Sequence, residues 1–401
     1  MRAILIASAL CLAATSAYAQ QATVTNWQDN LRGSSSETDV STHHAGDVGA
    51  TAIAAGNASA ATGDGADVNF DNTQHAVGNA TATVNAHVGS ASGNMALTSV
   101  AIGNGVTAAT SDGDVTLRSA QTVNGDATAT TNVFSGAVSN TAASSAASGN
   151  VAAVSADNGD INAAMSQISD GGVSATTNAT HCCVAGQAVA DAIASHNNVS
   201  VGGYTTTSIT ETRQRASGAS TATTNLNVGH AQGASGNATA NGNALAIDNQ
   251  WGYANATASQ QSSANVAARS TVTLGHDFTG FASAGAYGVG NSTTVSNVGS
   301  DTVMNVTQDN SGDISADASM TGAGGDQALA SSAAYGNVVT GSLCAYCDAN
   351  GGPSMTANNY QTNSGDVHSL ASVNAPYANT VAATSSAIGN AATFQVTGPG
   401  G

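Results

Sequence analysis

Small apolar and polar residues alternate along most of the chain, and this pattern predicts short β-strands. Residues 81–85 (TATVN), 128–132 (TATTN) and 221–225 (TATTN) place Ala on one face with Thr or Asn beside it, and β-branched residues are frequent, as is typical of strands. No segment has a regular helical period, and residues 187–195 are the best candidate for a helix. The chain is therefore predicted to be all-β.

Turn sequences bound the predicted strands. In these turns Gly or Asn is expected to supply a positive φ. They are Asp112-Gly113-Asp114, Asn124-Gly125-Asp126, Asn158-Gly159-Asp160, Ser311-Gly312-Asp313 and Ser364-Gly365-Asp366. The turn Asp residues are also candidate calcium ligands, but they do not match the calcium-binding Gly-Gly-x-Gly-x-Asp repeat, so turn chemistry is the preferred interpretation.

The alternation is organised into one repeat of about 47 residues that is read about eight times. One series of Asn residues recurs every 46 to 48 residues, with a last step of 53: Asn57, Asn104, Asn150, Asn197, Asn243, Asn291, Asn337 and Asn390. A series of Gln residues runs in phase with it: Gln28, Gln74, Gln121, Gln167, Gln214, Gln260, Gln308 and Gln361. In six consecutive units, Ala follows the Gln by eight residues. Three phased series are not expected of an unstructured Gly/Ser/Ala linker.

Each unit has room for about four short strands, which we interpret as two rungs of roughly 23 residues. A β-solenoid and a β-propeller both accept this pattern. The chain has only 5 Phe and 2 Trp, too few for the bulky layers between propeller blades, whereas a solenoid core can be filled by Ala, Val and Thr with Asn and Gln stacked as ladders. We therefore predict a β-solenoid, with the propeller as the alternative. Roughly 16 rungs would make a rod about 75 Å long.

The two ends of the chain differ from the repeat. Residues 1–19 have the positive start, apolar stretch and Ala17-Tyr18-Ala19 cleavage signature of a signal peptide, so the protein is expected to be exported. Residues 20–50 are expected to form an N-terminal segment or cap, residues 51–390 the repeat domain and residues 391–401 a C-terminal tail. No later stretch of 18 or more apolar residues predicts a membrane-spanning helix.

The composition excludes several classes of function. With 24 acidic residues, 6 arginines and no lysine, the formal charge is −18, which disfavours nucleic-acid binding. Large apolar side chains are too few for the core of a layered α/β enzyme. A secreted β-helix enzyme acting on polysaccharide would need several carboxylates or cations converging on one face, which regular units with two Glu and no Lys disfavour. We expect no enzymatic activity and no cofactor.

Four cysteines follow the signal peptide. Cys344 and Cys347 form a Cys-x-x-Cys motif, for which a disulfide is favoured over a metal or redox site. Cys182 and Cys183 are adjacent, and the 162 residues between Cys182 and Cys344 are expected to span about seven coils, too far for a bond. A strained vicinal disulfide, free thiols and an intermolecular bond all remain open for the adjacent pair.

The remaining polar candidates are interpreted as surface residues. His43 and His44 are adjacent, and His181 precedes Cys182, but no acidic residue completes a zinc or catalytic spacing around them, so solvated histidines are expected. Arg213 and Arg215 form the one cationic spot and are expected to keep the surface soluble rather than to bind a ligand.

The repeat resembles that of a known family. An exported leader, Gln/Asn/Gly/Ala/Thr-rich units, a recurring Ala-x-Gly-Asn and a Gln closing the hairpin resemble the holdfast anchor protein D family of stalked alphaproteobacteria. The Ala-x-Gly-Asn motifs are Ala101-Ile102-Gly103-Asn104, Ala147-Ser148-Gly149-Asn150 and Ala387-Ile388-Gly389-Asn390. The units are also similar to amyloid-like curlin repeats, but the period is longer and four cysteines are present.

The resemblance implies an outer-membrane-associated protein at the cell surface. Together with a fibre-forming companion and an outer-membrane secretion pore, such a protein would tie the adhesive holdfast polysaccharide to the cell envelope. A self-assembling curlin-like fibre subunit and a secreted adhesin are the alternatives, and self-association is expected in the first of them.

Overall fold

The computed structural model describes residues 21–276, 278–345 and 352–398, and these residues form 22 β-strands and no helix. The eight-stranded sheet contains, in spatial order, β1 (Gln21–Asn30), β4 (Asp67–Ala76), β6 (Val115–Val123), β8 (Ile161–Ser169), β11 (Ser208–Ala216), β14 (Ala254–Ser262), β17 (Thr302–Asn310) and β20 (Met355–Asn363).

The second sheet contains short strands and long return strands. The short strands are β2 (Ser34–Ala45), β9 (Val173–Val184), β12 (Ser220–His230), β15 (Val266–Leu274), β18 (Ile314–Thr321) and β21 (Val367–Asn374). The return strands are β3 (Val48–Asp64), β10 (Gln187–Tyr204), β13 (Gly233–Gln250), β16 (Phe281–Val298), β19 (Gly324–Cys344) and β22 (Tyr377–Thr397). Two strands, β5 (Ala80–Ser111) and β7 (Ala127–Asp157), continue from the short position into the return position.

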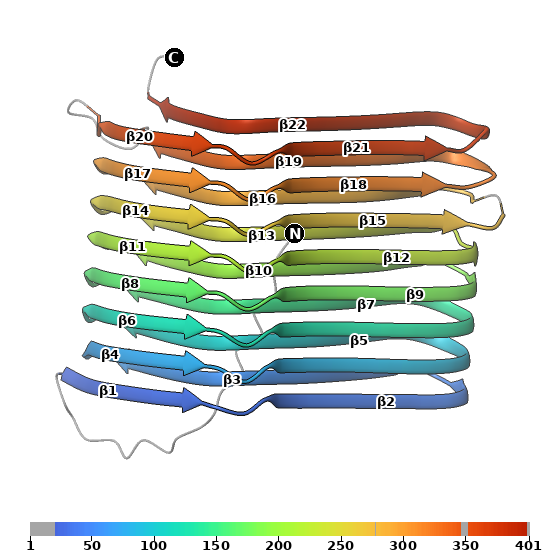
Figure 1. Ribbon diagram of the computed structural model, residues 1–401, viewed down its shortest axis with the longest axis horizontal. Helices are drawn as coiled ribbons and strands as arrows, with labels where there is room; N and C mark the ends of the chain where they lie inside the picture. Colours follow the sequence, from blue (N-terminus) through green and yellow to red (C-terminus); the bar gives the residue numbers. More distant parts are fainter. Residues whose placement is uncertain (1–20, 277, 346–351, 399–401) are drawn as a thin grey trace.

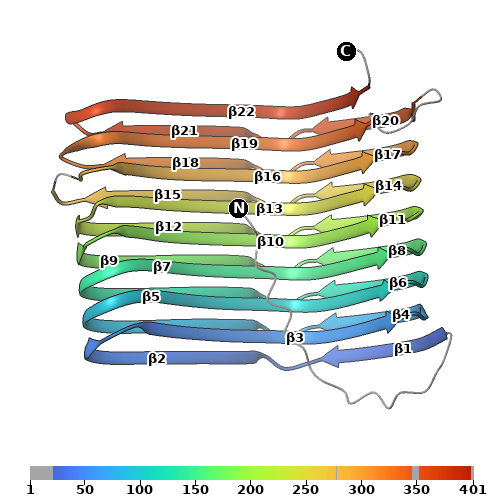
Figure 2. The ribbon, with the colours of Figure 1, turned by 180° about the vertical axis from the view of Figure 1, so that it is seen from behind.

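The chain follows the same circuit eight times. A strand of the eight-stranded sheet leads into a short strand in the same layer, and the return strand runs back behind both (Figure 1). We call one such circuit a coil. Figure 2 shows the return strands from behind, stacked in chain order. Every strand pairs in parallel with its equivalents in the neighbouring coils. This parallel stacking does not fit the antiparallel blades of a propeller.

One coil takes a whole repeat unit, not half of one. Gln28 pairs with Gln74, and Gln74 pairs with Gln121, so equivalent positions in adjacent coils are 46 or 47 residues apart here. The expectation of two 23-residue rungs per unit is therefore wrong. Eight coils at 4.7–4.9 Å per strand place the first and last strands about 34 Å apart, which replaces the rod of 75 Å.

Residues 187–195, the best candidate for a helix in the sequence, instead form the start of β10. Ala188, Ala190, Ala192 and Ala194 are buried at alternate positions, so the segment has the period of a strand. Pairing with β7 on one side and β13 on the other overrides the helical propensity of its alanines.

Two apolar clusters fill the space between the layers. The first half of each return strand packs against the short strands, mainly through Ala and Val such as Ala82 and Ala190. The second half packs against the eight-stranded sheet through larger side chains such as Phe70, Leu117 and Met304. Because small side chains suffice for the first cluster, the layers are filled despite the few aromatic residues.

In the middle of each return strand, a Gly-Asn step, or His196-Asn197 in β10, reverses the alternation between buried and exposed residues. In β5, Ala101 and Gly103 are buried, and Asn104 and Val106 after them are also buried. Two consecutive inward residues are typical of a β-bulge. Because of this bulge, the apolar residues before and after the step both point into the interior. A Cβ on Gly103 would lie 2.6 Å from the Gly149 carbonyl oxygen, so only glycine fits.

The turns fit the sequence prediction only in part. Positive φ falls on Asn158, an Asn as expected, but in the turn of residues 112–114 it falls on Asp112 and not on Gly113. A Cβ on Gly113 or Gly159 would instead overlap the backbone of the coil before. The glycines are therefore needed because adjacent turns stack closely.

Both terminal segments continue the repeat. Residues 20–50 contain β1 and β2, which pair in register with β4 and β5 and so belong to the first coil. In the segment 391–401, β22 extends to Thr397 and pairs with β19 along its length. The outer edges of the first and last coils pair with no other described strand.

Candidate functional site

The Gln series of the sequence forms a continuous column in the interior. Each Gln Nε2 donates to the Oε1 of the Gln one coil earlier, at 2.7–2.9 Å, through all seven steps from Gln361 to Gln28. The same Nε2 groups also donate across the interior to a backbone carbonyl of the return strand, at 2.8–3.3 Å. The Gln column thus links successive coils and joins the two layers.

The Asn series forms a second column beside the first. Each Asn Nδ2 donates to the Oδ1 of the Asn one coil later, at 2.7–3.0 Å, from Asn57 to Asn390. It also donates to the carbonyl of the residue that follows the next Gln, as Asn104 does to Thr122 at 2.8 Å. The structure therefore brings all sixteen predicted ladder residues together, in two columns that donate in opposite directions.

Two histidines are buried in this stack. His196 replaces the Gly before Asn197, and its Nδ1 lies 2.9 Å from Ser169 Oγ. His181, which we expected to be solvated, is buried, and its Nδ1 lies 2.6 Å from Ser135 Oγ. Desolvation by burial lowers the pKa of both rings to about 4. Both are therefore neutral at pH 7, while His43 and His44 are exposed as expected.

The turn carboxylates accept hydrogen bonds from the next coil. Asp67 Oδ1 accepts from the Asp114 backbone N–H at 3.0 Å, and Asp114 Oδ1 accepts from the Asp160 N–H at 2.8 Å. Asp301 accepts from the backbone and side chain of Ser354, and these bonds lower its pKa. Within the described ranges, no three His, Cys, Asp or Glu side chains gather in a metal-binding arrangement.

The three described cysteines occupy two separate places. Cys182 and Cys183 are both exposed at the end of β9, with their Sγ atoms 2.7 Å apart. Cys344 ends β19, three coils away, which is about 14 Å along the stack rather than the seven coils expected. This distance still exceeds the reach of a disulfide. The predicted bond between Cys344 and Cys347 lies outside the described residues.

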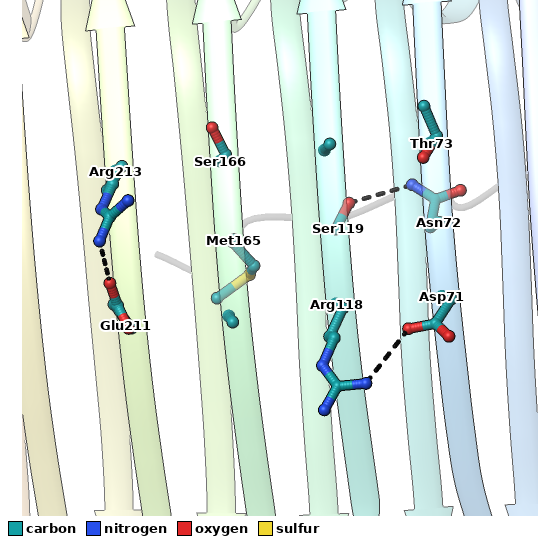
Figure 3. A pocket seen from close by; sticks show the side chains of 11 residues that line it. Asp71, Asn72, Thr73, Arg118, Ser119, Met165, Ser166, Glu211 and Arg213 are labelled. Carbon is teal, nitrogen blue, oxygen red and sulfur yellow. Dashed lines mark hydrogen bonds and ion pairs between the residues drawn. The ribbon is translucent and has the colours of Figure 1, made fainter.

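A groove of about 500 Å³ crosses the outer face of the eight-stranded sheet (Figure 3). Its floor is β8, whose outward residues are small, such as Ala164 and Ser166. Its walls carry the ion pairs Asp71–Arg118, at 3.8 Å, and Glu211–Arg213, at 2.7 Å. Exposed Arg215 pairs with Asp170 at 3.1 Å. The cations that we expected at the surface are there, and each has its own carboxylate.

A second groove of about 400 Å³ crosses the outer face of the short strands. One side is a stripe of outward amides, in which Asn85, Asn132 and Asn178 are joined by hydrogen bonds of 2.9–3.0 Å. The other side is His87 stacked on Phe134, with ring centroids 5.0 Å apart. We call this surface the amide–aromatic stripe. The sequence analysis placed Asn85 and Asn132 at the ends of predicted strand segments but missed the neighbouring aromatic pair, since the two aromatics have no equivalents in other units.

Comparison with known families identifies the family of this chain. A family model described as holdfast attachment protein D matches residues 42–314. The chain belongs to the holdfast attachment protein D family. The resemblance noted in the sequence is thus confirmed. No curated protein and no solved structure matches the chain.

The match to the holdfast attachment protein D family spans the stacked coils. It extends from β2 to the first residue of β18 and so contains the ladder Asn of six return strands, the amide–aromatic stripe and the groove of Figure 3. The described part of this family member holds no helix long and apolar enough to cross a membrane.

Proposed function

We propose that this family member is a single β-solenoid of eight coils that acts as a structural protein at the cell surface. In this role it ties the adhesive holdfast polysaccharide to the cell envelope, together with other holdfast anchor proteins and the outer-membrane pore through which it is secreted. It is exported, remains associated with the outer membrane, and acts without enzymatic activity, cofactor or nucleic acid. The match to the holdfast attachment family is the observation that carries this proposal.

The interior of the stack supports a mechanical role. Successive coils are joined by backbone ladders and by one bond in each amide column, for example Gln121 to Gln74 and Asn104 to Asn150. These amides are buried and have no water molecules as alternative partners. Separating two adjacent coils therefore leaves several polar groups without hydrogen bonds. Such a stack holds its shape with a thin apolar core, as a spacer under tension requires.

The amide–aromatic stripe is the surface that we assign to polysaccharide. Asn132 and Asn178 each donate one Nδ2 proton to the preceding Asn of the stripe and retain a second one for a ligand. Asn85 Nδ2 instead donates to Asp39 at 2.9 Å and to Glu37 at 3.3 Å. Phe134 is 52% exposed and offers a flat apolar face. Sugars present hydroxyl groups at their edges and C–H groups on their faces, and amides beside an aromatic ring match both. The groove of Figure 3 is less suited, because its charges are already paired.

Binding of purified protein to isolated holdfast polysaccharide tests the proposal. We expect the wild type to co-sediment with the polysaccharide and the double variant Asn132→Ala/Phe134→Ala to lose at least tenfold in affinity. Tyr204→Ala is the matched control, because Tyr204 is exposed to a similar extent, at 51%, on a return strand. Its affinity is expected to equal that of the wild type. Absence of wild-type binding would contradict the anchoring role, and unchanged binding by the double variant would contradict the assigned surface.

A further inference from the structure

The two ends of the stack expose unpaired strand edges. In the described structure, β1, β2 and β3 pair only with strands of the second coil. The last coil, β20 to β22, pairs only with the coil before it. Figure 1 shows these two coils as the first and last layers of the stack. Unpaired edges of regular strands are templates for adding further strands.

The amide columns end with complementary groups. The Gln column donates toward the first coil, so Gln361 Oε1 in the last coil receives no bond from the described residues, while Gln28 Nε2 has one proton left after bonding Ala58. The Asn column donates the other way, so Asn390 Nδ2 lacks an acceptor and Asn57 Oδ1 lacks a donor among the described residues. Each acceptor without a donor at one end of the stack thus has a matching donor without an acceptor at the opposite end.

A uniform shift of 333 residues would align all three strands of the last coil with those of the first, since Gln361, Val367 and Asn390 then meet Gln28, Ser34 and Asn57. Inward residues of β20 and β1 would then pair apolar with apolar and amide with amide. The pairs, written last coil first, are Met355 with Ala22, Ala357 with Val24, Asn359 with Asn26, Gln361 with Gln28 and Asn363 with Asn30.

Exposure and charge agree with an interface at this place. The last coil leaves apolar side chains in solvent, among them Val381 at 50% and Tyr377 at 81%. Residues 355–397 contain a single acidic residue, Asp366, and no Lys or Arg, so the last coil adds little repulsion against the acidic first coil. The partner that fits this edge is therefore a second copy of this chain.

We infer that copies of the protein stack end to end, the last coil of one on the first coil of the next, with both amide columns continuing across the junction. Gln28 of one copy would donate to Gln361 of its neighbour, and Asn390 would donate to Asn57 and to the carbonyl of Asp29. Because the two surfaces differ, the contact is heterologous and does not close, so it builds a filament. This inference goes beyond the anchoring role and does not depend on polysaccharide binding.

Two substitutions block one end each and keep the side-chain bond to the neighbouring coil, although Gln28→Glu also loses the bond from Gln28 Nε2 to the Ala58 carbonyl. Gln28→Glu retains the acceptor for Gln74 but replaces the free donor with a charged acceptor. Asn390→Asp retains the acceptor for Asn337 and removes the donor at the other end. Thr25→Glu is the matched control, since it places the same charge on the outward face of β1.

Sedimentation velocity and negative-stain microscopy of the exported chain over a hundredfold concentration range test the inference. We expect wild type and Thr25→Glu to lengthen with concentration, and each blocked variant to remain monomeric with wild-type circular dichroism. An equimolar mixture of the two blocked variants is expected to stop at dimers, because it contains one competent junction. A wild type that stays monomeric, or blocked variants that form filaments, would overturn the inference.

Discussion

Asn150 and Gln167 lie side by side in the interior and donate in opposite directions along the stack. Asn150 donates to Asn197 in the next coil at 2.8 Å, and Gln167 donates to Gln121 in the coil before at 2.9 Å. Asn150 also bonds the carbonyl of Ile168, the residue after Gln167, which holds the two columns together. The opposed amide dipoles offset each other, so the interior carries long polar columns without a large net dipole.

Breaking the Gln column in its middle is expected to destabilise the whole stack. Gln167→Leu leaves Gln214 Nε2 without its side-chain acceptor and Gln121 Oε1 without its donor, both buried. We expect a loss of about 2–5 kcal/mol in the free energy of unfolding, measured by urea denaturation. Gln261→Leu, on the outer face of β14, is the control and is expected to change it by less than about 0.5 kcal/mol. Equal effects of the two changes would show that the column contributes nothing.

Adding one methyl group at the Gly-Asn step is expected to destabilise the return strand. In Gly103→Ala the new Cβ meets the Gly149 carbonyl oxygen and Val123 Cγ2 at 2.6 Å, so we expect a loss of about 1–3 kcal/mol. Gly105→Ala, two residues away, has no atom nearer than 3.9 Å and is expected to be neutral or slightly stabilising. Thermal melting of both variants checks the difference, and a reversed order would contradict the bulge.

Stability is expected to fall as the pH drops from 6.5 to 4. The folded pKa of His181 and His196 is about 4, whereas the unfolded value is near 6.5, so in this window only the unfolded chain takes up these two protons. Each histidine then costs about 1.4 kcal/mol per pH unit. Burial raises the pKa of Asp191, which opposes this trend near its lower end. Urea unfolding at several pH values measures the slope.

The histidine origin of this slope is tested by substitution. His181→Gln and His196→Gln each remove one titrating ring, so we expect the slope between pH 6.5 and 4 to fall by half in either variant. The double variant is expected to lose most of it. A wild-type stability that is flat across this window would contradict the buried, neutral state of both rings.

The vicinal thiols are expected to influence each other. Hydrogen bonding to Cys182 raises the pKa of the Cys183 thiol. In reduced protein, Cys182→Ala is therefore expected to increase the rate of Cys183 alkylation by iodoacetamide near pH 8, because the thiolate is the reacting form. Cys183 is exposed, so access does not limit the comparison. An unchanged rate would contradict the contact between the two sulfur atoms.

The amide columns were predictable because a hydrogen-bonded ladder needs the same side chain at the same place in every coil. The predicted number of residues per coil was wrong, since alternation identifies strands and faces but not which strands pair. A usable signal was present. A coil of 23 residues would stack Leu97 on Gln74 and Ser144 on Gln121, which breaks the Gln column.

Features present in one coil only escaped the sequence analysis. His181 lies among polar neighbours in sequence, and its burial follows from packing between coils. The stacked pair His87 and Phe134 forms because β5 and β7 are adjacent in the correct register. The helical interpretation of residues 187–195 failed because alanine suits a helix and a tightly packed parallel strand equally well.

The most direct test of the account is a spin-label distance along the eight-stranded sheet. Labels at Arg118→Cys and Asn358→Cys occupy the same outward register on β6 and β20, five coils apart. The native cysteines Cys182, Cys183, Cys344 and Cys347 are replaced by Ser in this variant. With one coil per repeat unit, we predict a backbone separation of about 24 Å. A separation of about 48 Å, as two rungs per unit require, would contradict the stack described here.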